Sequence, residues 1–173
     1  MKSTAHIGGH PIHPMLIPFP FAFLTGAAAF DVLSASRRDH HLGTTARHLG
    51  LAGLASAAVA AVPGLIDYIG TVPDGEPRQT ATRHLALNLS ALACFAGAAS
   101  LRRDDMLPSA PTVALGLAGT VLLSLGGWLG GHLSYHHRIG VHPDPAERQL
   151  TDRAPAGGPG QLASGNLESV GHS

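Results

Sequence analysis

Four apolar runs constrain the fold of this chain more than any other feature of its sequence. They cover approximately residues 15–33, 49–66, 85–101 and 112–133. Each is close to the length of about 20 residues that a helix needs to cross a hydrocarbon core roughly 30 Å thick. The runs lack a period of two, so their backbone polar groups must be satisfied inside helices rather than in a barrel. The sequence therefore predicts an all-α fold, a four-helix transmembrane bundle with spans near residues 14–36, 46–68, 83–102 and 110–137.

The composition favours a membrane bundle over a soluble one and excludes several classes of site. Only 13% of the 173 residues are charged, and a soluble bundle would need polar outward faces that these runs lack. The 11 Lys+Arg balance the 11 Asp+Glu, so no basic surface is available to bind nucleic acid. A single cysteine cannot form an internal disulfide or a thiolate zinc site. Histidine, with 12 copies, is the abundant ligand type instead.

The connections and the C-terminal region predict how the chain is divided. Short polar links at residues 36–41 and 70–77 make sequential spans antiparallel. After Val141 the sequence becomes rich in proline and glycine and loses its apolar runs. We therefore expect a four-span membrane domain over residues 1–141 and a disordered C-terminal tail over residues 142–173. Direct inspection of the sequence finds no internal repeat.

The antiparallel topology sorts most of the histidines onto one membrane face. The face that receives the start of the first and third spans also receives the end of the second and fourth. Each span thus contributes a possible metal ligand or proton carrier to one layer. The candidates in this layer are His10, His13, Asp67, His84, His132 and His136.

Residue spacing sharpens this expectation in two places. His10 and His13 are three residues apart, and His132 and His136 are four apart, so each pair would share one helical face and could chelate a metal. Two prolines inside the first span remove helical hydrogen-bond donors and predict a kink there. Such a kink would turn the preceding His-Pro motif inward over the bundle.

The opposite face has a thinner set of candidates, namely Asp31, His40, His41 and His48. Asp31 is the carboxylate that lies within a span, on the same stripe as His13. An unpaired charge in hydrocarbon costs roughly 2.5–3.5 kcal/mol on insertion scales. We therefore expect Asp31 to face the bundle interior and to have a partner such as His48, a backbone amide or a bound water.

Several of these segments carry a family resemblance. The stretch over residues 9–20, Gly-His-Pro-Ile-His-Pro-Met-Leu-Ile-Pro-Phe-Pro, resembles the opening signature of the bacterial DUF2231 membrane-protein family. Residues 30–33, 64–68, 83–88, 126–133 and 140–141 are similar to further segments of the family. The resemblance implies a four-helix multi-pass protein of the bacterial cytoplasmic (inner) membrane, found in some cases beside redox domains. It assigns no catalytic residues.

Three functions of different classes are compatible with the sequence. The first is a redox-associated module in which His10, His13, His84 and His132 bind haem b or a transition metal, with His136 and Asp67 as further metal ligands. The second is a small proton-coupled transporter that uses Asp31, Asp67 and His84. The third is a scaffold or accessory subunit without chemistry of its own. Its partners would be the lipid bilayer and, in addition, redox proteins or further copies of the chain.

An enzyme acting alone is not expected. The sequence has no nucleophile elbow, no His-Glu-x-x-His motif and no glycine loop of the kind that binds phosphate. We therefore assign no catalytic residue and interpret the histidines as ligands.

Overall fold

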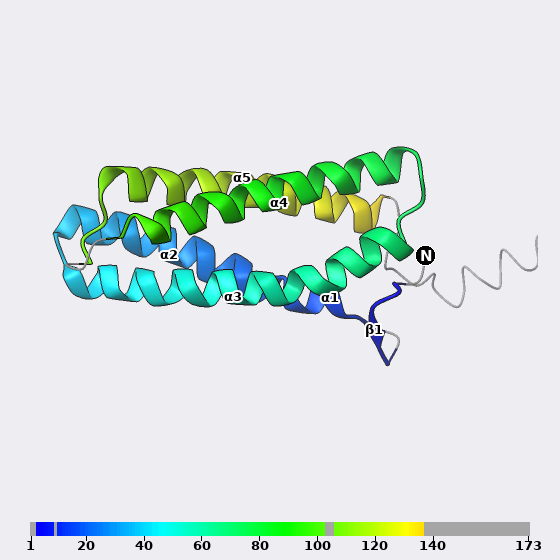
Figure 1. The fold of residues 1–173 in the computed structure, drawn as a ribbon, viewed down its shortest axis with the longest axis horizontal. Helices are drawn as coiled ribbons and strands as arrows, with labels where there is room; N and C mark the ends of the chain where they lie inside the picture. The colour runs from blue at the N-terminus through cyan, green and yellow to red at the C-terminus, as the bar shows by residue number, and fades with distance from the viewer. Residues whose placement is uncertain (1–2, 9, 103–105, 137–173) are drawn as a thin grey trace, which may run out of the picture. The chain divides into compact units, whose positions relative to one another are not determined.

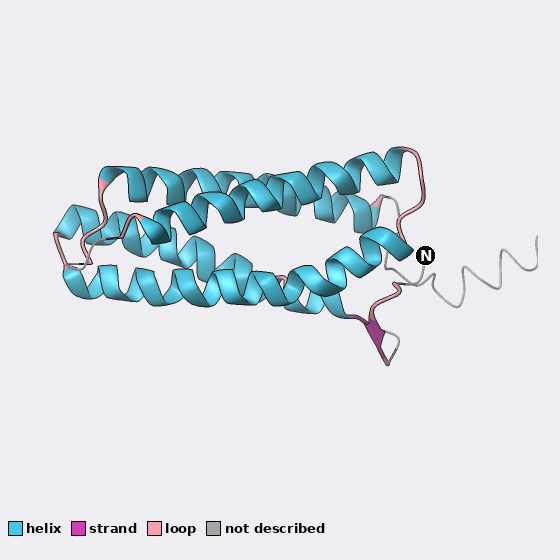
Figure 2. Ribbon diagram, viewed as in Figure 1, coloured by secondary structure: helices cyan, strands magenta, loops and turns pink. Residues whose placement is uncertain are grey.

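The computed structural model describes residues 3–8, 10–102 and 106–136. Two short strands, β1 (His6–Ile7) and β2 (His10–Pro11), pair in antiparallel fashion near the N-terminus. Helices make up most of the remaining described residues (Figures 1 and 2). They are α1 (Ile12–Leu16), α2 (Pro18–Arg37), α3 (His40–Gly70), α4 (Glu76–Ser100) and α5 (Ala110–Tyr135). The expected tail over residues 142–173 lies outside the described residues, and the division after residue 141 stays a prediction.

The predicted four-helix transmembrane bundle is confirmed, with α1 and α2 together forming the first helix. Among the described residues, three segments are long and apolar enough to cross a membrane, namely Ile12–Arg37, His40–Gly70 and Ala110–Tyr135. Two helices begin earlier than predicted. Asp39 caps α3 because its carboxylate accepts hydrogen bonds from the backbone N–H of His41 and Leu42. Pro77 sits in the first turn of α4, where proline is tolerated.

The predicted kink in the first span appears as the boundary between α1 and α2. Ile17 separates the two helices, and Pro18 and Pro20 follow it directly. Neither proline has an N–H to donate, so the ladder of backbone hydrogen bonds is interrupted here. The break lets α1, which carries His13, pack against α3 on a path of its own.

The helices pack as two antiparallel hairpins (Figure 1). We call α2 with α3 the first hairpin and α4 with α5 the second hairpin. Between the hairpins, α2 packs against α5 and α3 packs against α4. The buried centre contains Leu24, Ala28, Ala91, Phe95 and Leu123. Small residues dominate the interfaces, as expected where helices associate by close backbone approach rather than by a hydrophobic driving force.

The two hairpins make the same internal contacts at corresponding positions. In the first hairpin, Gly53 faces the side chain of Leu24, and a Cβ at this glycine would lie 2.6 Å from Leu24 Cδ2. In the second, Gly119 faces Phe95, with 2.8 Å to Phe95 Cε2. A second pair of contacts agrees with the first. A Cβ at Gly26 would lie 3.5 Å from Leu49 Cδ1, and a Cβ at Gly97 would lie 3.3 Å from Leu115 Cδ1.

These contacts reveal an internal repeat, so the inspection that found none was wrong. Helix α2 corresponds to α4 with a shift of 71 residues, the same separation as between Asp31 and Arg102. Helix α3 corresponds to α5 with a shift of 66, and both helices carry the pentapeptide Leu-Gly-Leu-Ala-Gly, at residues 49–53 and 115–119. Corresponding helices run in the same direction, so the hairpins are related by a pseudo-twofold axis along the bundle.

Candidate functional site

Two histidines at one end of the bundle occupy equivalent positions in the repeat. His13, on α1, lies 71 residues before His84, on α4. The Nδ1 atom of His13 is 2.8 Å from the carbonyl oxygen of Ala60 on α3. The Nδ1 atom of His84 is 2.7 Å from the carbonyl oxygen of Gly126 on α5. Each ring therefore reaches from the first helix of its hairpin to the backbone of the second.

A glycine one turn further along the second helix makes room for each ring. A Cβ at Gly64 would lie 2.7 Å from His13 Cε1, and a Cβ at Gly130 would lie 3.0 Å from His84 Cε1. Both distances are too short for a larger residue unless the ring moves. One glycine of α5 thus seats an imidazole as well as allowing the helices to approach closely.

The hydrogen bonds fix the tautomer of both rings. A carbonyl oxygen can only accept, so Nδ1 of each ring must carry the proton and donate it. Nε2 is then the nitrogen with the free lone pair, as in most metal-binding histidines, whose other N–H donates to a carbonyl or carboxylate. His13 and His84 are both partly buried. Each ring can therefore offer its Nε2 lone pair to a ligand while Nδ1 stays bound to the backbone.

Asn88 distinguishes the two otherwise similar sites. Its Nδ2 atom is 3.1 Å from Nε2 of His84 and 2.9 Å from the backbone oxygen of the same residue. Ile17 stands at the corresponding position of the first hairpin. Within the described part of the chain, no residue hydrogen-bonds to Nε2 of His13. The His13 lone pair is thus the more available of the two.

Asp67 has a different set of contacts from the one expected. Its carboxylate accepts hydrogen bonds from the Ser3 hydroxyl, at 2.7 and 2.8 Å, and from the Ala5 backbone N–H, at 3.1 Å. Thr71 Oγ1 lies 3.3 Å away. The carboxylate therefore fastens the N-terminal segment to the end of α3, just before the strands and helix α1 that carry His10 and His13.

The remaining expected ligands belong to other elements of the fold than this pair. His10 belongs to strand β2 and is exposed, so the expectation that it shares a helical face with His13 is wrong. His132 and His136 do share a face of α5, and their rings stack with centroids 4.6 Å apart. Among the described residues, no group of three or more His, Cys, Asp or Glu side chains is placed to hold a metal ion. The candidate site is therefore the pair His13 and His84.

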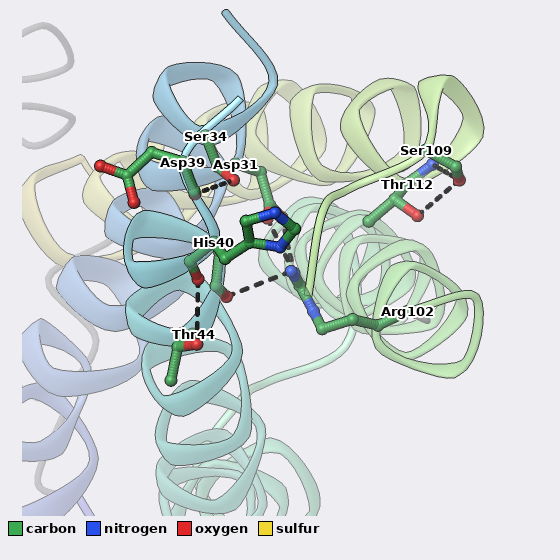
Figure 3. A network of polar contacts seen from close by, with 9 residues as sticks. Asp31, Ser34, Asp39, His40, Thr44, Arg102, Ser109 and Thr112 are labelled. Atoms are coloured by element: carbon green, nitrogen blue, oxygen red, sulfur yellow. Dashed lines mark hydrogen bonds and ion pairs between the residues drawn. The ribbon is translucent and has the colours of Figure 1, made fainter. Parts of the chain in front are cut away.

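At the other end of the bundle, Asp31 faces the interior as predicted, but its partner was not anticipated. Arg102 Nη2 lies 2.8 and 2.9 Å from the two carboxylate oxygens, and Nη1 donates to the Gly43 carbonyl at 3.3 Å (Figure 3). The side chains of Arg102 and Asp31 are only 7% and 4% exposed. His48 is exposed on α3 and takes no part. The counter-ion is thus supplied by Arg102, which directly follows the third apolar run.

Comparison with known proteins agrees with this architecture. The sequence profile of the family described as "Predicted membrane protein (DUF2231)" matches residues 9–143. The chain belongs to the DUF2231 family. No curated protein sequence and no solved structure matches the chain significantly. The family match supports an integral membrane protein and leaves its activity to be argued from the site.

Proposed function

We propose that this DUF2231 protein is a redox-associated module of the bacterial cytoplasmic membrane that binds one transition metal ion between His13 and His84. The observation that carries the proposal is the pair of Nδ1 hydrogen bonds to the carbonyls of Ala60 and Gly126. They leave both Nε2 lone pairs as acceptors. Among the described residues the Nε2 atom of His13 has no hydrogen-bond donor, and that of His84 has only the Asn88 amide, so both lone pairs can be offered to a metal ion.

A bare metal ion is better supported than haem b. Each ring packs directly against a glycine backbone, at Gly64 and at Gly130, so the rings are held in narrow slots between helices. A metal ion needs nitrogen ligands at about 2.0–2.1 Å and little other space. Haem would need a flat gap that admits the whole macrocycle. Imidazole suits zinc and copper among the first-row metals.

The same proposal extends to a wider set of ligands. In that form the coordination is completed by His10, His132, His136 or Asp67. His132 follows Gly130 within two residues and stacks on His136. The carrier alternative receives less support because Asp31 and Asp67 both have hydrogen-bond partners that a transport cycle would have to break.

Metal analysis of the purified full chain tests the proposal. The protein is extracted in detergent, stripped with a chelator and titrated separately with Zn²⁺, with Cu⁺ and with haem b, and bound metal and visible absorption are recorded. We expect one metal ion per chain. His13→Ala and His84→Ala should each reduce the affinity at least tenfold, since each removes one of two ligands.

His48→Ala is the matched control because this histidine is exposed at the other end of the bundle. Circular dichroism of each variant verifies that the helices persist. Strong haem absorbance that both His13→Ala and His84→Ala abolish would replace the bare ion by haem. Failure of the wild-type chain to bind any of the three probes would overturn the proposal and favour the scaffold function.

A further inference from the structure

The pseudo-twofold axis relates two interfaces between the hairpins, and they are not equally closed. We call the α2–α5 interface the first seam and the α3–α4 interface the second seam. At the first seam, a Cβ at Gly116 would lie 3.5 Å from the Cβ of Ala28. The equivalent residues of the second seam are Gly50 and Ala99. A Cβ at Gly50 would have only Ala27, of its own hairpin, within 4 Å, at 3.8 Å.

The open seam leads into a cavity. Its volume is about 130 Å³, similar to the roughly 150 Å³ of an apolar cavity that holds a benzene-sized molecule. Small residues from all four long helices form most of its wall, together with Leu51 and Phe95. Those small residues are Ala27, Ala28, Ala46, Gly50, Ala98, Ala99 and Gly116. The cavity is therefore wide enough for a short length of hydrocarbon chain.

Among the described residues that line the cavity, the charges do not balance. Asp31 and Arg102 line it and pair with each other. Arg47 also lines it and is exposed, and no described residue forms an ion pair or a hydrogen bond with the Arg47 guanidinium. Arg47 lies two turns into α3, about 10 Å along the helix from its start. Val113 stands at the equivalent position of the closed seam, so the extra positive charge belongs to the open seam alone.

We propose that the second seam is a binding site for an anionic phospholipid. The cavity takes part of an acyl chain between α3 and α4, and the Arg47 guanidinium binds the phosphate of the headgroup. Arginine pairs well with phosphate because its planar donors match the phosphate oxygens. A bilayer-embedded protein meets such lipids from the side, and the opening between two lipid-facing helices admits them without unfolding. The site is separate from His13 and His84 and does not depend on metal binding.

Native mass spectrometry of the full chain tests this site. The protein is reconstituted into nanodiscs that contain equal amounts of phosphatidylglycerol and phosphatidylcholine with identical acyl chains, and retained lipids are counted after release. We expect the wild type to retain phosphatidylglycerol preferentially. Arg47→Gln should reduce this preference roughly fivefold, the effect of one arginine near a lipid surface. Gly50→Leu should reduce retention of both lipids because its side chain fills the open seam.

Two variants serve as matched controls. Arg83→Gln removes an exposed arginine of α4 near the other end of the bundle, and Gly127→Leu adds a side chain at a glycine whose Cβ would meet only Phe21, at 4.0 Å. Neither should change lipid retention. Equal retention of the two lipids by the wild type, or an equal loss in Arg83→Gln, would overturn the proposal. So would full displacement of the lipid by inorganic phosphate, because the acyl chain would then contribute nothing.

Discussion

Each end of the bundle contains a pair of residues at equivalent positions of the two hairpins, and the two pairs differ in their chemistry. At one end the equivalent positions are His13 and His84, the same side chain in both hairpins. At the other end the equivalent positions are Asp31 and Arg102, which carry opposite charges and form an ion pair. Opposite charges satisfy each other across the axis. Two identical imidazoles cannot form such an ion pair, which is why the first end is the candidate ligand site and the second end is a structural ion pair.

The largest expected effect comes from breaking the ion pair between Asp31 and Arg102. Arg102→Leu leaves the Asp31 carboxylate buried without a counter-ion, and we expect the free energy of unfolding to fall by about 3–5 kcal/mol. Thermal unfolding of the purified protein in detergent measures this loss. The exchange of both residues, Asp31→Arg with Arg102→Asp, should restore most of it because the positions are equivalent. An exchange as unstable as the single variant would contradict the pseudo-twofold relation.

The next effect concerns the slot that holds His84. Gly130→Leu places a branched side chain where the imidazole now lies, with a Cβ only 3.0 Å from His84 Cε1. We expect a loss of about 1–3 kcal/mol in unfolding free energy, the usual cost of overpacking, and weaker metal binding. Gly131→Leu is the control because a Cβ there would meet no atom within 4 Å. Similar losses in both variants would show that the added side chain destabilises helix α5 itself and does not act through the His84 ring.

A smaller effect is expected at the anchor of the N-terminal segment. Asp67→Ala removes the acceptor of the Ala5 amide and of the Ser3 hydroxyl. The Ala5 amide should then exchange its hydrogen roughly tenfold faster, since a hydrogen bond to a charged group contributes about 1.5 kcal/mol or more. Hydrogen-exchange mass spectrometry detects the change. Asp74→Ala, in the exposed loop before α4, should leave the Ala5 amide unaffected.

The smallest effect tests the asymmetry between the two imidazoles. Asn88→Ile gives the second hairpin the residue that the first has at this position, Ile17. The change removes the amide that competes for Nε2 of His84, a bond worth about 0.5–1.5 kcal/mol. We therefore expect metal affinity to rise by up to roughly tenfold in a calorimetric titration. A fall in affinity would mean that Asn88 holds the ring in place.

Three of the four predicted spans coincide with described helices that are long and apolar enough to cross a membrane, because hydropathy is a property of each segment by itself. The break at Ile17 followed from Pro18 and Pro20 for the same reason, and so did the inward turn of His13. The hydrogen-bond partners of Asp67 could not be predicted, since they lie in the N-terminal segment, more than 60 residues away. His10 was misplaced because the short strands before α1 carry no apolar period.

The repeat escaped inspection for two physical reasons. Its matching residues are mostly glycine, alanine and leucine, which any membrane helix contains for packing, so they give little signal. The shift also changes from 71 in the first helix to 66 in the second, because equivalent positions are separated by five fewer residues in the second hairpin than in the first. Contacts such as Gly53 with Leu24 and Gly119 with Phe95 reveal the repeat because they do not depend on residue identity.

The pairing of Asp31 with Arg102 also has a consequence for biosynthesis. The two residues are 71 positions apart, so at about 5–20 residues per second the ribosome makes the arginine roughly 4–14 s after the carboxylate. During that interval the first hairpin enters the bilayer with its acidic residue still lacking its counter-ion. A chain cut short before residue 102 would keep this defect permanently. The buried pair therefore distinguishes chains cut short before residue 102 from longer ones, because only the shorter chains keep the uncompensated charge.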